Sequence, residues 1–138
     1  QAGAMGAGVP AALAAKSIFP NRQVICFAGD GDFQMSASEL GTAMQESLNP
    51  IILIHNNGSY GTIRMHQEMR YPKRVSGTNL KNPNFKCIAE AYNFGYSKIT
   101  NLSEFKVAFE KAKTIDVGFI IEMLADIKDI SPGKIIDL

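Results

Sequence analysis

The chain has 138 residues, a length that corresponds to one domain with its own core. Hydrophobic residues make up 46% and charged residues 20% of the sequence, as in ordinary globular proteins. The net charge of +1 gives no reason to expect binding to nucleic acid or to a membrane surface. No apolar run reaches the ~18 residues of a membrane-spanning helix, and no signal peptide is recognisable.

The first helix is predicted over residues 11–16, behind a glycine-rich segment and Pro10. The segment 6–11 also fits the dinucleotide fingerprint GxGxxA, but no strand precedes it, so we favour a close helix contact through small residues. Apolar runs predict strands at 24–28 and 51–55. Between them, Ser36 and Glu39 match a capping box that would start an amphipathic helix carrying Leu40.

The second half of the chain continues this alternation. Predicted helices cover 62–70, 85–92 and 102–113, predicted strands cover 96–99 and 118–124, and a polar loop covers 71–84. Asn82, before Pro83, is expected to cap the helix that follows. Cys26 and Cys87 are expected to be buried reduced thiols, because no CxxC or Cys/His cluster is present. The fold class is therefore α/β, with a parallel sheet flanked by helices on both faces, and the compartment is reducing.

Polar residues follow the first two long strands where each one ends. Asp30 follows the first strand and Asn57 the second, and the carboxyl ends of parallel strands share one edge of a sheet. Carboxylate and amide oxygens suit Mg²⁺, which is usually held by one or two protein groups and by phosphates. Gly29 and Gly31 would let the backbone approach a phosphate closely. Alone, each cluster would be an ordinary turn, and only their joint occurrence favours a site for a metal-bridged diphosphate.

These residues carry a resemblance to a known family. The spacing Gly29-Asp30-Gly31, 24 residues, then Asn56-Asn57 resembles the signature of thiamine-diphosphate-dependent enzymes. The upstream run 3–12 resembles the Gly-x-Met-Gly-x-Gly-x-Pro-Ala-Ala segment of the same family. The chain is most similar to the diphosphate-binding domain of acetolactate-synthase-like enzymes. The resemblance therefore implies one such domain over 1–138, and the start at Gln1 inside a motif suggests a C-terminal fragment of a longer chain.

The resemblance also implies roles for individual residues. Mg²⁺ would be bound by the side chains of Asp30 and Asn57 and by the carbonyl of Ser59. The diphosphate would be held at the cofactor-binding positions Gly29, Gly31, Asp32 and Phe33, the last three through backbone N–H groups. Gly3 would accept a hydrogen bond from the aminopyrimidine, and Met5 would hold the cofactor bent. The activating glutamate of the family lies on a companion pyrimidine-binding domain of another subunit, so no catalytic residue is assigned here and the domain alone is expected to be inactive.

One segment departs from the family. Acetohydroxyacid synthases carry a Met-Val-x-x-Trp-like run after the asparagine pair, where this chain has Thr62, Ile63 and His66. Ile63 and His66 are therefore candidates for the substrate pocket, and the identity of the substrates stays open. His55 ends an apolar strand without a nearby partner and is interpreted as a core or rim histidine.

The resemblance implies 2-oxoacid decarboxylation with carboligation in a cytoplasmic homodimer or homotetramer. The expected cofactors are thiamine diphosphate and Mg²⁺; no motif indicates FAD, which the family leaves open. Two alternatives remain: a simple decarboxylase of the benzoylformate type, and a non-catalytic module that holds the cofactor or assists assembly.

Overall fold

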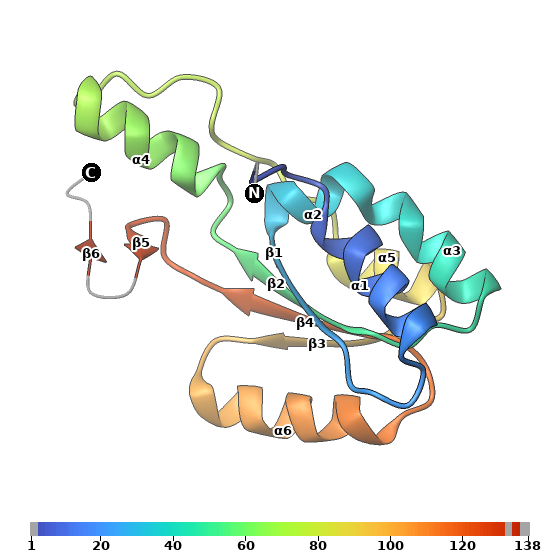
Figure 1. Ribbon diagram of the computed structural model, residues 1–138. Helices are drawn as coiled ribbons and strands as arrows, with labels where there is room; N and C mark the ends of the chain where they lie inside the picture. The colour runs from blue at the N-terminus through green and yellow to red at the C-terminus, as the bar shows by residue number, and fades with distance from the viewer. Residues whose placement is uncertain (1–2, 132–133, 136–138) are drawn as a thin grey trace.

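The computed structural model describes residues 3–131 and 134–135. Residues 1–2, 132–133 and 136–138 of the predicted domain 1–138 lie outside the described residues. Four parallel strands form one sheet in the order β1-β2-β4-β3 (Figure 1). Their bounds are β1 Ile25–Gly29, β2 Ile51–Asn56, β3 Gly95–Ile99 and β4 Phe119–Leu124.

Helices cover both faces of the sheet, which confirms the predicted fold class (Figure 1). One face is covered by α1 Gly8–Ile18, α2 Asp30–Ser36, α3 Leu40–Gln45 and α5 Phe85–Ala91. The other face is covered by α6 Leu102–Thr114. The continuous apolar run of β2 is buried between the two helical layers, as expected for a central strand of a parallel sheet.

The polypeptide turns into a helix directly at Asp30, earlier than predicted. A 3-10 turn, η1 over Ala37–Glu39, separates α2 from α3, so the predicted capping box at Ser36 is wrong. The Ser36 hydroxyl caps nothing and is buried without a hydrogen-bond partner in the described part of the chain. The early helix is favoured because it buries Phe33 completely, edge-on to the ring of Phe85 at 5.6 Å between centroids.

Two other expectations about α5 are wrong. Its N-cap is Asn84, whose side chain accepts hydrogen bonds from two backbone N–H groups, and not Asn82. Cys87 is exposed, because α5 buries Phe85 and Ala89 and the position two residues after Phe85 faces away from the sheet. Cys26 is buried as expected, and burial, with a smaller contribution from the charge of Asp32, raises its thiol pKa to about 11.

The helix α4, Gly61–Arg70, projects away from the sheet (Figure 1). Within the described part of the chain, none of its residues is buried. A short antiparallel pair, β5 Asp129–Ser131 and β6 Lys134–Ile135, follows β4, beyond the last predicted strand at 118–124. Among the described residues, no helix has the length and apolar character needed to cross a membrane.

Candidate functional site

Strand register brings the two polar clusters to one edge of the sheet. Gly29 at the end of β1 lies opposite His55 near the end of β2, so the residues that follow them emerge side by side. The backbone N–H of Gly58 donates to Oδ2 of Asp30 at 2.9 Å, although 28 positions separate the two residues. The sequence-predicted juxtaposition of the segments after β1 and β2 is therefore present.

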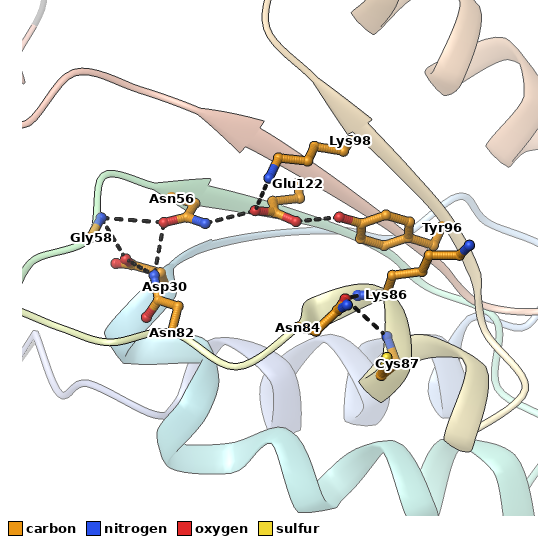
Figure 2. Close-up of polar contacts among 10 residues, drawn as sticks. All are labelled: Asp30, Asn56, Gly58, Asn82, Asn84, Lys86, Cys87, Tyr96, Lys98 and Glu122. Carbon is orange, nitrogen blue, oxygen red and sulfur yellow. Dashed lines mark hydrogen bonds and ion pairs between the residues drawn. The ribbon is translucent and has the colours of Figure 1, made fainter.

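Asp30 is the centre of this edge, and only 1% of its surface is exposed. Its Oδ2 accepts hydrogen bonds from Gly58 and, at 2.6 Å, from the side-chain amide of Asn82 (Figure 2). Its Oδ1 accepts one described hydrogen bond, from the N–H of Gly31 at 3.0 Å. A carboxylate oxygen has two acceptor sites, and the described residues use one of those on Oδ1. The other site can accept a further ligand.

A cleft of about 380 Å³ opens beside Asp30, within the size range of small-molecule sites. It is lined by Gly3, Met5, Gly29, Asp30, Gly31, Asp32, Ser59, Tyr60, Gly61, Thr62 and Ile63. Eight of the eleven lining residues were candidates from the sequence. The lining includes two carboxylates and, among these residues, no lysine or arginine, so the cleft is suited to a cation rather than to a bare anion.

Two contacts hold the walls of this cleft. A Cβ atom on Gly31 would lie 2.4 Å from Cε1 of Tyr60, so only glycine fits beneath that ring. The N–H of Gly6 donates to Oδ1 of Asp32 at 2.5 Å, which fixes the glycine-rich loop against α2. Gly3 in that loop has a φ of +60°, a left-handed conformation that glycine adopts readily.

Three predicted site residues do not line the cleft. Phe33 has its side chain in the core, so only its backbone is available to a ligand. Asn57 turns its Oδ1 back to accept from the N–H of Ser59 at 3.1 Å, and His66 is exposed on α4. His55 is exposed at the end of β2, at the rim rather than in the core. Among the described residues, no group of three or more His, Cys, Asp or Glu side chains gathers to hold a metal.

Three polar residues that the structure connects to Asp30 had no role in the site predicted from the sequence, although Asn56 belongs to the motif that carries the resemblance. Asn82 donates to Asp30 and, at 2.8 Å, to Oδ1 of Asn56. Asn56 in turn donates to Oε1 of Glu122 at 2.7 Å. Glu122 had a signal, since it is the single charge in the apolar run 119–124. Asn82 had none, because its partners lie 26 and 52 positions away.

A parallel α/β sheet with a cleft lined by two carboxylates at the carboxyl ends of its strands defines a ligand-binding domain of the doubly wound class. Residues 1–123 match the family model described as "Thiamine pyrophosphate enzyme, C-terminal TPP binding domain". The chain belongs to this family, which confirms the resemblance in the motifs.

Similar proteins include the acetolactate synthase large subunit of Buchnera aphidicola subsp. Schlechtendalia chinensis, 41% identical over 86% of this chain and 21% of the relative. The acetolactate synthase isozyme 2 large subunit of Escherichia coli (strain K12) is 33% identical over 90% of this chain and 23% of the relative. A solved structure, the Rhodococcus jostii RHA1 thiamine diphosphate-dependent 4-hydroxybenzoylformate decarboxylase, superposes with a TM-score of 0.82 at 30% identity. That match covers 88% of this chain and 23% of the solved chain. The chain thus spans between a fifth and a quarter of the length of these proteins.

Proposed function

We propose that this domain holds the diphosphate of thiamine diphosphate through a bound Mg²⁺ in an acetolactate-synthase-like enzyme. The observation that carries the proposal is the charge of the cleft, whose lining has the carboxylates of Asp30 and Asp32 and no cationic side chain. A diphosphate could not stay there against two carboxylates without a divalent cation between them. The oxygen-rich donor set, with Oδ1 of Asp30 still able to accept a ligand, fits Mg²⁺.

The residues that would hold the group follow from this arrangement. Asp30, Asn57 and the carbonyl of Ser59 would bind the metal, with Asn57 turning its Oδ1 away from Ser59. Backbone N–H groups at the start of α2, at Gly31, Asp32 and Phe33, would bind phosphate oxygens. The N–H of Gly31 donates to Oδ1 of Asp30 at 3.0 Å and would have to share its hydrogen with the phosphate. Gly29 would leave room for that approach, since a Cβ atom added there would meet only Asp32 Cβ, at 3.9 Å, whereas the space beside Gly31 is filled by the ring of Tyr60.

Other lining residues of the cleft would position the organic portion of the cofactor. Gly3 and Met5 line the same cleft as Asp30, and the family resemblance implies the aminopyrimidine contact for Gly3 and the wedge for Met5. When bound, thiamine diphosphate supplies a thiazolium ring that accepts the electron pair released in decarboxylation. The described residues would bind and orient it, and Ile63 would limit the space for the substrate, with His66 one turn further along α4.

The reaction we propose is decarboxylation of a 2-oxoacid followed by ligation to a second carbonyl compound. The similarity to acetolactate synthase large subunits supports it. The chain would be the C-terminal domain of a longer cytoplasmic protein, in which a companion domain of another subunit completes the site in a homodimer or homotetramer. A simple decarboxylase is the second candidate, favoured by the superposition on the Rhodococcus jostii decarboxylase. Product analysis with pyruvate, alone and with aldehydes, would separate the two, since release of free aldehyde alone would contradict carboligation.

Calorimetric titration of thiamine diphosphate into the full-length protein, with Mg²⁺ and with EDTA, tests the cofactor role. Binding should require Mg²⁺, and Asp30→Ala should abolish Mg²⁺-dependent binding. Asp116→Ala, a change of one exposed carboxylate far from the cleft lining, is the control. Equal binding by Asp30→Ala and by the control would overturn the metal assignment. No binding in either condition by the unaltered protein would favour the non-catalytic module that assists assembly.

A further inference from the structure

Glu122 is a buried carboxylate that core packing does not explain. Only 4% of its surface is exposed, and it follows three fully buried apolar residues in β4. Burying a charge is costly unless hydrogen bonds and opposite charges compensate it. The partners of Glu122 therefore indicate why the strand carries this residue.

The register of three strands delivers those partners to one face. Lys98 on β3 and Ile54 on β2 lie directly opposite Glu122, so Tyr96 and Asn56, two positions away on those strands, face the same side. Oε1 of Glu122 accepts from Asn56 at 2.7 Å and lies 3.6 Å from Nζ of Lys98. Oε2 accepts from the hydroxyl of Tyr96 (Figure 2). Burial, then the hydrogen bond to Glu122, raises the pKa of Tyr96 above its ordinary range, so Tyr96 stays a donor.

The carboxylate fixes the direction of the hydrogen bonds that follow. An ionised carboxylate can only accept, so Asn56 must turn its Nδ2 toward Glu122 and its Oδ1 away. That Oδ1 accepts from the N–H of Gly58 at 3.2 Å and from Asn82 at 2.8 Å. Asn82 then directs its other amide hydrogen to Oδ2 of Asp30 at 2.6 Å.

The hydrogen-bonded series from Glu122 through Asn56 and Asn82 thus ends on Asp30 (Figure 2). Because a carboxylate lies at each end of this series, each of the two amide side chains can satisfy its hydrogen-bond partners in only one of its two flip orientations. Oδ2 of Asp30 accepts hydrogen bonds from Asn82 and Gly58, which fill its two acceptor sites. Oδ1 accepts one, from Gly31, and is therefore the oxygen available for a metal.

We propose that Glu122 is a positioning residue for the metal–diphosphate site, acting through the amides of Asn56 and Asn82 on the carboxylate of Asp30. This inference rests on the proposed function, because the metal it positions is the Mg²⁺ of that site. Partners that orient metal ligands are typically worth 10–100-fold in metal affinity.

The test measures Mg²⁺ affinity by calorimetry in the full-length protein saturated with thiamine diphosphate. Glu122→Leu removes the acceptor and should weaken Mg²⁺ binding on the order of tenfold or more. Glu122→Gln loses the same charge but can still present an oxygen to Asn56, so it should recover most of that affinity. Lys86→Met removes an exposed charge that lines the same pocket as Glu122 and that pairs, among the described residues, with Glu90, and it should leave the affinity unchanged.

Hydrogen exchange of β2 and β4 without ligands separates positioning from folding. A merely structural role would lower protection in each variant in proportion to its loss of affinity. In the positioning role, Asn56→Ala combined with Glu122→Leu costs no more affinity than Asn56→Ala alone. Unchanged Mg²⁺ affinity in Glu122→Leu, or equal loss in the Leu and Gln variants, would overturn the proposal. Absence of Mg²⁺-dependent binding in the unaltered protein would instead refute the proposed function.

Discussion

Gly31→Ala tests whether the contact beneath Tyr60 requires glycine. The added Cβ would lie 2.4 and 2.7 Å from two ring carbons of Tyr60 and 3.0 Å from Cδ1 of Leu80. Overpacking of this kind costs about 1–3 kcal/mol, and the upper part of that range applies because a ring carbon is well inside van der Waals distance. Alanine recovers about 1 kcal/mol of helix propensity at this position in α2. The net loss of stability is therefore about 1–2 kcal/mol, or roughly 5–30-fold in the equilibrium for opening.

Gly41→Ala is the matched control, because Gly41 is also a helical glycine. Its added Cβ would meet Cε1 of Tyr92 at 3.5 Å, an ordinary contact, so only the propensity gain of about 1 kcal/mol remains. Hydrogen exchange of the β1 and β2 peptides in the full-length protein reports both effects on this domain. Exchange should become faster in Gly31→Ala and slower in Gly41→Ala. A change of the same sign in both variants would refute the steric reasoning.

Further predictions concern thiols, a helix cap and one exposed carboxylate. Iodoacetamide at neutral pH should label Cys87 and spare Cys26 in the native protein, as read by peptide mass spectrometry. Because the Cys26 pKa rises from 9.0 to about 11, the unfolded thiol ionises first, so stability should fall between pH 9 and 11. Cys26→Ala should make that slope smaller, and the part that remains near pH 10 and above is expected from Tyr96, whose pKa is also raised. Asn84→Ala should lower the free energy of opening of α5 by about 1 kcal/mol, as measured by hydrogen exchange of its peptides, whereas Asn84→Asp should keep the cap and the protection. Hydrogen bonds from Thr100 lower the pKa of Glu104 from its ordinary value of 4.5, and an NMR titration of the carboxyl group should show this. The stability that the ionised Glu104 contributes should therefore be lost as pH falls through the pKa of the folded state.

The parts of the fold that the sequence predicted depend on local pattern. The run from Ile51 to Ile54 is apolar throughout because β2 is buried on both faces, and a strand prediction needed nothing else. The helix from Asp30 to Ser36 was missed because glycine and aspartate favour turns locally. The burial of Phe33 against Phe85, 52 positions later, outweighs that preference.

The candidate site was predictable where it lies next to strand ends. Asp30 and the segment after Asn57 come together because parallel strands end at one edge, a rule that needs no side-chain detail. The involvement of Asn82 depends on the path of the loop over residues 71–84, which no periodicity specifies. Its Asn-Pro sequence predicted a helix cap, yet the cap is supplied by Asn84, two residues on.

The projection of α4 from the sheet has a consequence for how such domains diversify. Within the described part of the chain, no residue of α4 is buried. Substitutions along this helix should therefore change the free energy of unfolding very little. Asp30, by contrast, is 1% exposed and accepts three described hydrogen bonds, a setting in which few replacements are tolerated. Residues that border the mouth of the cleft, such as Ile63, can therefore change while the surroundings of Asp30 stay the same. Under the proposed function, one cofactor site could then serve different substrates at little cost in stability.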